Sequence, residues 1–321
     1  MNNSKFKTRV LDKTEYDLWD DFVLSSPQGS IFHNSKWIET CVENAENRSV
    51  KLYGTFRGEE LIGGCPIFFG KKYGIFRYGT SNLSLTPYGG FLLPVEKSTK
   101  VRENEQIRKE IINSLISNIL DEKLVLLSII NSPELKDIRS FTWNRWKTDI
   151  LYTYIFDLDQ NIWDSVSKNV RWTIRKAQKN EIAIEKKFDV DLYWKLNVDT
   201  YKKQGLKPPF GKKYISDLIR LLEETDSGEM WIAKMPNGDV ASAEILTWDN
   251  KMAYRWSAAS CNDYKDTGAT SFLLYAIFEN LKDRGFRKIN LMAANTPHLT
   301  KFISSFNPEL VPYYKISRNR W

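Results

Sequence analysis

Glu244 and Arg255 are opposite charges in the middle of otherwise apolar, strand-like segments. Residues 240–248 and 252–260 alternate as strands do, and Asp249-Asn250 between them has the form of a two-residue turn. Counting back from that turn places Glu244 directly opposite Arg255, partly buried. Such a pair is either a structural ion pair or a catalytic carboxylate whose pKa the arginine tunes. Tyr254 points to the other face of its strand, as a core residue or as a contact for substrate.

Few residues offer nucleophilic or metal chemistry. The chain contains three cysteines, far apart, and two histidines. Separated cysteines in odd number are typical of reduced thiols in a cytosolic protein, and no spacing matches a zinc site. A serine or cysteine triad would need a histidine base, and His33 and His298 both have ordinary structural explanations. We therefore predict no metal and no covalent nucleophile.

Basic segments are the second candidate for chemistry. A helical pattern over residues 161–179 carries Arg171, Arg175 and Lys179 at four-residue intervals, which places them on one ridge. This ridge is either a solvated helix face or a surface for a polyanion. A further basic loop, around residues 208–211, is expected near an acceptor cleft or free in solvent; its lysines are Lys202, Lys203, Lys207, Lys212 and Lys213.

Composition narrows the class of partner. The formal net charge of +7 favours an anionic partner such as a nucleotide, a phosphorylated sugar, tRNA or a membrane surface. No apolar stretch approaches the ~20 residues that span a bilayer, and no signal-peptide core follows the first residues. We expect a cytoplasmic protein whose contact with a membrane is at most peripheral.

The order of elements predicts how these residues are positioned. Two hairpins over residues 230–260 precede a loop, a helical pattern over 272–281 that stops at Gly285, and a strand over 288–292. The N-terminal half repeats this order more faintly. The sequence thus predicts an α/β (α+β) protein with two tandem lobes, residues 1–158 and 159–321, each a mixed, mostly antiparallel sheet flanked by helices.

The second lobe resembles the core of GNAT-type acyltransferases. In that fold a loop-to-helix junction offers backbone N–H groups to the pyrophosphate of the acyl donor. Lys265, Gly268 and Thr270 stand at the matching positions, with threonine where a smaller residue is usual. Asn295 matches a later asparagine of the family, whereas Phe302 replaces the tyrosine that often serves as general acid. The resemblance implies that the first three bind the donor and that Asn295 binds substrate.

A more specific resemblance begins at residues 170–182, with Arg171, then Arg175-Lys176-Ala177 and Lys179. This segment resembles the Fem family of peptidoglycan interpeptide-bridge aminoacyltransferases and their double-GNAT relatives. Supporting segments that extend the resemblance over nearly the whole chain are residues 32–37, 87–90, 200–205 and 299–314. The family fold implied is a pair of GNAT-like lobes in tandem.

The Fem resemblance also implies binding residues. Lys203 matches a position where an arginine contacts the precursor's diphosphate, and Lys36 lies beside the position of another phosphate-binding lysine. Arg171 and Arg175 would add positive charge for substrate. Two further polar positions of the family are occupied here by Leu93 and Ile303, which implies a different acceptor or donor.

Three functions follow from this resemblance and from the residues. The first is amide formation on an amine of a phosphate-linked cell-envelope precursor, with aminoacyl-tRNA as donor and no tightly bound cofactor. The second keeps the fold but uses acetyl or acyl coenzyme A and an amino sugar. The third is a non-catalytic binder of RNA or an anionic polymer. DNA is not among the expected partners.

Overall fold

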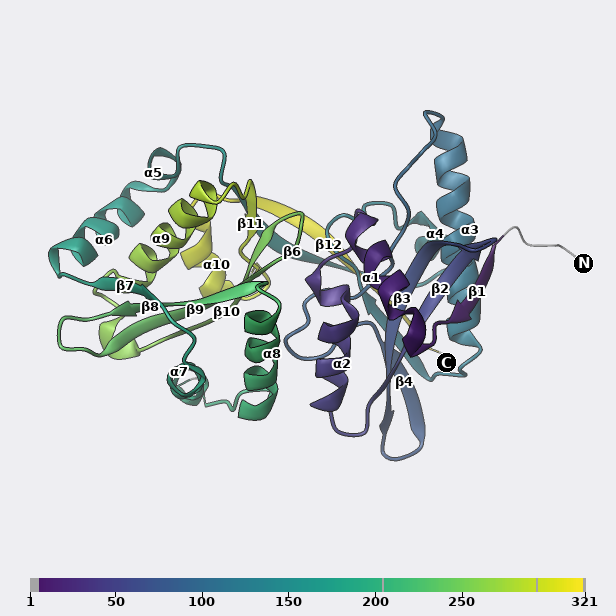
Figure 1. Ribbon diagram of the computed structural model, residues 1–321, viewed down its shortest axis with the longest axis horizontal. Helices are drawn as coiled ribbons and strands as arrows, with labels where there is room; N and C mark the ends of the chain where they lie inside the picture. The colour runs from purple at the N-terminus through teal and green to yellow at the C-terminus, as the bar shows by residue number, and fades with distance from the viewer. Residues whose placement is uncertain (1–5, 204, 293, 320–321) are drawn as a thin grey trace, which may run out of the picture. The chain divides into compact units, whose positions relative to one another are not determined.

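The computed structural model describes residues 6–203, 205–292 and 294–319, and its chain forms two compact units. The first unit is Met1–Leu151 together with Pro312–Trp321, and the second is Tyr152–Val311. Each consists of a sheet with helices on both faces (Figure 1). The predicted class, mixed α/β with mostly antiparallel sheets, is confirmed.

The first unit contains the N-terminal sheet. Its strands are β1 (Lys7–Val10), β2 (Ser49–Arg57), β3 (Glu60–Lys72), β4 (Phe76–Thr80), β5 (Leu126–Ile130) and the C-terminal β12 (Glu309–Asn319), in the order β1-β2-β3-β4-β5-β12. Its helices are α1 (Tyr16–Ser25), α2 (Ser35–Glu43), α3 (Val101–Leu120) and α4 (Arg139–Thr142).

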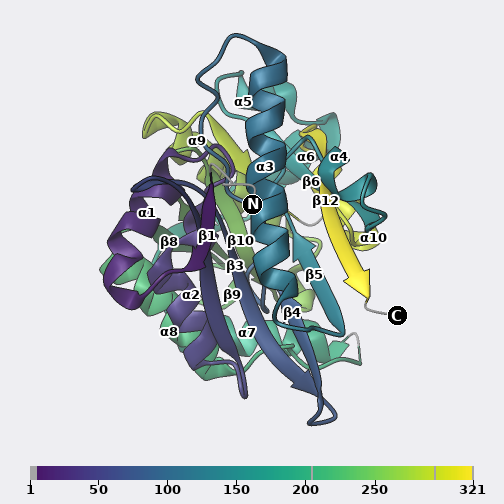
Figure 2. The same ribbon diagram turned by 90° about the vertical axis from the view of Figure 1, so that its right-hand side faces the viewer.

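Consecutive residues of β3 face opposite layers of helices. Gly63 lies against Ile111 of α3, and Gly64 lies against Trp19 of α1. The helices accordingly lie on two sides of the sheet, with α3 on one face and α1 on the other (Figure 2). A Cβ at either glycine would come within 2.4 Å of these side chains, so the sheet needs glycine there to keep both layers close.

The second unit contains the segment that the sequence singled out. Its strands are the end of β6 (Lys147–Asp157), then β7 (Ala183–Lys186), β8 (Gly228–Lys234), β9 (Val240–Trp248), β10 (Ala253–Ser260) and β11 (Lys288–Asn290), in the order β6-β11-β10-β9-β8-β7. Its helices are α5 (Ile162–Ser165), α6 (Lys168–Lys179), α7 (Val190–Lys203), α8 (Lys212–Glu224), α9 (Ala269–Asp283) and α10 (Pro297–Ser304). Helices α6 and α9 cover one face of the sheet, and α7 and α8 the other (Figure 1).

The two units repeat one topology. In each, three antiparallel strands (β2-β3-β4 or β8-β9-β10) lead into a long helix, and the strand after that helix pairs in parallel with the third strand. The strand that follows in each sheet comes from the other half of the sequence. The C-terminal β12 pairs with β5 in the first unit, and β6 pairs with β11 in the second. The compact units therefore differ from the predicted division at residue 158, because a single cut of the chain cannot represent exchanged strands.

Local signals in the second unit were interpreted correctly, but the strand register was not. The hairpin at residues 235–239 and the helix ending before Gly285 are confirmed. The turn after Trp248, however, contains four residues, because Asp249 Oδ1 accepts the N–H groups of Lys251 and Met252 at 2.8 and 3.1 Å. Trp248 therefore pairs with Ala253 instead of Lys251.

Candidate active site

An irregularity in β10 lies at the centre of the second unit's sheet. Arg255 is paired with Leu246 of β9, but the next pair is Ser257 with Ile245, so Trp256 is an extra residue in a β-bulge. On the other edge, β10 pairs with β11 only at Ala253 and Tyr254, because β11 ends at Asn290. Beyond the bulge, β10 therefore has β9 on one edge and no described strand on the other.

After this strand, a loop over residues 261–268 leads to the N-terminus of α9. Gly268 is the N-cap, with a left-handed φ of 85°. A Cβ on this glycine would lie 2.2 Å from the backbone oxygen of Thr173 in α6, so glycine allows the loop to pack against that helix. The backbone N–H groups of Thr270 and Ser271 have no acceptor within the described chain. The first turn of α9 can therefore donate to an anion.

Helix α3, the equivalent helix of the first unit, differs from α9 in the charge of its first turn. Its first turn already contains a carboxylate, Glu103, which accepts hydrogen bonds from Ser98 and Lys100. The first turn of α9 contains no acidic residue. The first turn of α9 thus offers an anion the positive end of the helix dipole and no carboxylate of its own, whereas the first turn of α3 already contains Glu103. The second unit is the better place for a phosphate-bearing ligand.

Glu244 and Arg255 form a buried ion pair, although not by the predicted register. Arg255 Nη2 lies 2.6 Å from Glu244 Oε1, with side chains 8% and 0% exposed. Glu244 is opposite Ala258, so the pair is diagonal across the strands and the predicted direct pairing is wrong. Burial raises the pKa of the Glu244 carboxyl, and the charge of Arg255 offsets part of that increase. Glu244 Oε2 and Arg255 Nε have no partner within the described residues.

A group of polar side chains connects α7 with the strand just after the bulge. Tyr193 Oη lies 2.5 Å from Ser257 Oγ, and Asn197 Nδ2 donates to Tyr193 Oη at 3.4 Å. Tyr193 is 0% and Asn197 3% exposed, whereas Ser257 is half-buried. Burial raises the pKa of the Tyr193 hydroxyl, which therefore stays protonated near neutral pH. These three residues were not predicted from the sequence; the i, i+4 spacing of Tyr193 and Asn197 was the available signal.

The basic ridge on α6 is divided between two roles. Arg171 Nη1 donates to the carbonyls of Trp163, Asp164 and Val166 at the C-terminal end of α5, at 2.8–3.2 Å. Its guanidinium therefore caps α5. Arg175 is exposed and lies over the ring of Trp163, and Lys179 is also exposed. Arg175 and Lys179 are thus the ridge residues available to a ligand.

Arg171→Ala is expected to lower the free energy of unfolding by about 1.5–3 kcal/mol, because three carbonyls lose a charged donor. The matched change Arg175→Ala removes an exposed cation–π contact and should cost about 0.5–1 kcal/mol. Urea unfolding followed by circular dichroism measures both. A loss for Arg175→Ala as large as that for Arg171→Ala would contradict the capping role.

The remaining predicted residues lie in varied surroundings. Asn295 bridges the backbone of Tyr152, accepting from its N–H at 2.9 Å and donating to its carbonyl at 2.8 Å. Tyr254 is buried and donates to Asp249 Oδ2 at 2.8 Å. Lys36 is exposed in the first turn of α2 in the first unit. Lys265 is exposed just before α9, and Thr270 is half-buried in its first turn.

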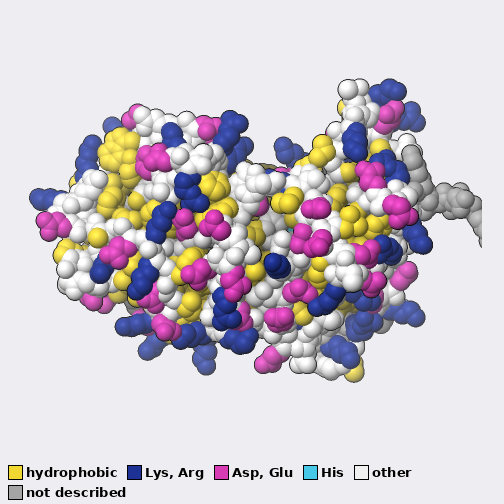
Figure 3. All heavy atoms as spheres, in the orientation of Figure 1, with side chains coloured by type: hydrophobic (Ala, Val, Ile, Leu, Met, Phe, Trp, Pro, Cys, Tyr) yellow, Lys and Arg dark blue, Asp and Glu magenta, His cyan; other side chains and the backbone are white. Residues whose placement is uncertain are grey.

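The predicted basic loop joins α7 and α8. Lys212 pairs with Asp191 and Lys213 with Asp217, so these two charges are balanced. Lys202 and Lys207 are exposed, and Lys and Arg side chains gather along the lower margin of the second unit where α7 and α8 lie (Figure 3). Lys203 ends α7, but its side chain lies outside the described part, so its predicted contact stays a prediction.

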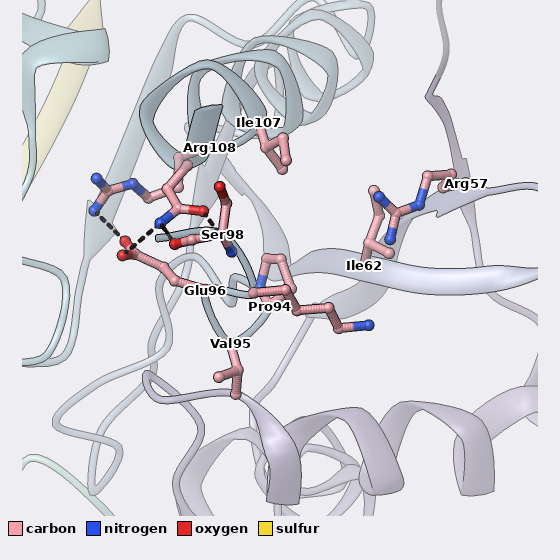
Figure 4. A pocket seen from close by; sticks show the side chains of 10 residues that line it. Arg57, Ile62, Pro94, Val95, Glu96, Ser98, Ile107 and Arg108 are labelled. Atoms are coloured by element: carbon pink, nitrogen blue, oxygen red, sulfur yellow. Dashed lines mark hydrogen bonds and ion pairs between the residues drawn. The ribbon is translucent and has the colours of Figure 1, made fainter. Parts of the chain in front are cut away.

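A cavity of about 360 Å³ lies in the first unit, and it is lined by segments of the chain other than those that carry the predicted residues. Ile62, Pro94 and Ile107 surround it, while the guanidinium of Arg108 turns to the carboxylate of Glu96 at 3.2 Å (Figure 4). Its other cations, Arg57 and Lys97, both pair with Glu60. None of the residues predicted from the sequence lines this cavity. Because carboxylates already pair with its cations, this cavity attracts the phosphates of an acyl donor less strongly than the first turn of α9 does.

Comparison with known proteins agrees with this geometry. Residues 164–299 match the family model described as an acetyltransferase (GNAT) domain, and this range includes β10, its bulge and α9. Residues 164–299 are therefore similar to a GNAT-fold acyltransferase domain. No curated protein is significantly similar to it in sequence. Among the described helices, none is long and apolar enough to cross a membrane.

Solved structures extend the similarity in fold over both units. FemX aligns with a TM-score of 0.72 at 14% identity, covering 96% of each chain. A tandem GNAT protein from the clavulanic acid biosynthesis pathway aligns with a TM-score of 0.59 at 9% identity, covering 98% of each chain. L-PGS from Bacillus licheniformis aligns with a TM-score of 0.55 at 11% identity, covering 95% of this chain and 91% of its own. The predicted Fem-type, double-GNAT fold is thereby confirmed.

Proposed function

We propose that this acyltransferase forms an amide bond between the acyl group of a phosphate-bearing carrier and the amine of a cell-envelope precursor. The observation that carries the proposal is the arrangement at the end of β10. A bulge, the loss of pairing with β11 and the unoccupied N–H donors of α9 follow one another within residues 254–271. An acyl carrier needs both an edge for its extended arm and donors for its phosphates.

Aminoacyl-tRNA is the donor we propose. Exposed cations on two elements of the second unit support a large polyanion: Arg175 and Lys179 on α6, and Lys202 and Lys207 around the end of α7. Such separated charges suit a nucleic-acid backbone better than a single pyrophosphate. FemX and L-PGS share the fold, but at 14% and 11% identity they do not transfer their substrates.

Acyl coenzyme A is the second candidate donor, with an amino sugar as acceptor. Two observations favour it: the match of residues 164–299 to an acetyltransferase domain, and the N–H groups of Thr270 and Ser271, which suit a compact pyrophosphate. In either case the acyl carbonyl would lie near the bulge of β10. Glu244 would then act as proton acceptor or orienting carboxylate, with Arg255 tuning its pKa.

A donor panel tests the proposal. The protein is incubated with an aminoacyl-tRNA mixture and an amine-bearing, diphosphate-linked peptidoglycan precursor, and separately with acetyl coenzyme A and glucosamine 6-phosphate. Mass spectrometry detects the amide product. We expect product from aminoacyl-tRNA that disappears when the tRNA is deacylated first.

A thermal-shift measurement separates the two donors independently of the acceptor. Acetyl coenzyme A at ~100 times its dissociation constant would add about 2.7 kcal/mol to the free energy of unfolding. Stabilisation by acetyl coenzyme A together with acetylated product would replace the tRNA proposal with the second candidate. Salt-sensitive RNA binding with no product from either donor would leave a non-catalytic binder and refute the transferase.

A further inference from the structure

Hydrogen bonds link Asn197, Tyr193 and Ser257 into a chain that runs from α7 to β10. Asn197 Nδ2 can only donate, so Tyr193 Oη accepts from it at 3.4 Å. At 2.5 Å either the Tyr193 or the Ser257 hydroxyl could be the donor. Because Tyr193 is buried and Ser257 Oγ is the acceptor that the described contacts offer its hydrogen, we assign Tyr193 as the donor. Ser257 keeps its own hydrogen for another acceptor, and the described residues offer none. Within the described part of the chain, the linked hydroxyls thus end in a Ser257 hydrogen that has no acceptor.

The position of this donor is set by the bulge. Trp256 is the extra residue, so the alternation of side chains shifts and Ser257 faces α7. Ser257 is half-buried, whereas the two groups behind it are almost fully buried. It also lies on the part of β10 that has no strand partner on the β11 side in the described structure. A ligand lying along that edge would meet the Ser257 hydroxyl.

We propose that Ser257 donates a hydrogen bond to the oxygen that becomes negative during acyl transfer, and that Tyr193 and Asn197 are positioning residues that aim it. The inference rests on the proposed function. In the reaction the amine nitrogen attacks the acyl carbon, a C–N bond forms, and the carbonyl electron pair moves to oxygen. That pair returns as the C–O bond of the ester, or the C–S bond of a thioester, breaks. The amine's proton ends on the leaving oxygen or sulfur, so Ser257 loses none.

The buried positioning residues suit this role better than proton transfer. Ionising Tyr193 in its buried position would be costly, which keeps its hydroxyl a fixed donor throughout the reaction. A preorganised donor in a dry site stabilises developing charge more than solvent does. Asn197 Oδ1 is buried without a partner in the described chain. The Asn197 amide therefore leaves one of its own hydrogen bonds unmade while its Nδ2 orients the Tyr193 hydroxyl.

The test compares serine variants on neighbouring strands, using whichever of aminoacyl-tRNA or acetyl coenzyme A gives product with the wild type. Ser257→Ala is expected to lower kcat about 10²- to 10³-fold, with the KM of the donor changed less than about threefold. Ser257→Thr keeps a hydroxyl and should recover most of the rate. Tyr193→Phe should lower kcat about tenfold. The control is Ser242→Ala on β9, whose hydroxyl already has an acceptor, the carbonyl of Ala259, at 3.5 Å.

Urea unfolding of each variant separates positioning from folding. A loss of kcat in Ser257→Ala with an unfolding midpoint like that of Ser242→Ala, and recovery in Ser257→Thr, supports the assignment. Wild-type kcat in Ser257→Ala overturns it and leaves the acyltransferase intact. A loss of rate that follows the loss of folded protein, unrecovered by threonine, overturns it in favour of a structural hydroxyl. Absence of wild-type product with either donor refutes the proposed function and this inference together.

Discussion

Arg255→Met is expected to lower the free energy of unfolding by about 3–5 kcal/mol, because it leaves a buried carboxylate without its counter-charge. Glu244 is 0% exposed and its Oε1 depends on Arg255 Nη2 at 2.6 Å. Methionine replaces the apolar stem of the arginine and removes only the charged group beyond it, so most of the loss reports the missing charge. Urea unfolding at neutral pH measures the difference from the wild type.

The penalty for Arg255→Met should depend on pH in a definite direction. Burial already raises the pKa of Glu244, and removing Arg255 removes the charge that lowered it, so the folded variant favours the protonated acid more strongly. A raised folded pKa contributes stability that is fully present below the unfolded carboxyl pKa of about 4.3 and is lost as pH rises through the folded value. The variant should therefore lie closest to the wild type in acid. A penalty that grows as pH falls would contradict a buried carboxylate.

A double replacement separates the charges from the shape of the pair. Glu244→Leu with Arg255→Met removes both charges and should be much closer to the wild type in stability than Arg255→Met alone. Turnover then distinguishes structure from chemistry. Glu244→Gln that folds but has lost turnover supports the proton-accepting role, whereas normal turnover with a large drop in melting temperature leaves the pair structural.

What the sequence could predict depended on how local each signal was. Gly238 and Gly285 fix their turns through their own left-handed backbone conformations, with φ of 89° and 85°, so the hairpin and the end of α9 were correctly placed. The register of β9 and β10 was not, since it depends on the side chain of Asp249 and on the bulge at Trp256. The predicted direct pairing of Glu244 with Arg255 was therefore wrong. The ion pair forms all the same, because these long side chains reach diagonal partners.

Side chains that serve distant backbone could not be recognised from the sequence. Arg171 and Asn295 both matched family positions. In the structure, however, Arg171 donates to the backbone of Trp163 and its neighbours, and Asn295 pairs with the backbone of Tyr152, 143 positions away. The exchange of β6 and β12 is equally non-local, because a strand's sequence does not specify which sheet it joins. Tyr193 and Asn197 resemble an ordinary helix face until the fold brings Ser257 to them.

Gly268→Ala is expected to be the most damaging single change at the proposed donor site. A Cβ there would lie 2.2 Å from the backbone oxygen of Thr173, so α6 or the start of α9 must move. Overpacking and a left-handed residue with a side chain together cost about 2–5 kcal/mol. The displaced first turn of α9 would also misdirect the N–H groups of Thr270 and Ser271. We therefore expect both a lower unfolding midpoint and at least tenfold weaker donor binding by the folded protein.

Gly285→Ala is the matched control, since it lies at the other end of the same helix. Gly285 has the same φ of 85°, but a Cβ there would meet nothing within 4 Å. Its substitution carries only the left-handed strain, roughly 1–2 kcal/mol, and leaves the first turn of α9 in place. Donor affinity, measured by calorimetry where the protein is folded, should fall for Gly268→Ala and stay unchanged for Gly285→Ala. Equal affinities in the two variants would mean that the donor does not bind at the start of α9, because only one substitution disturbs it.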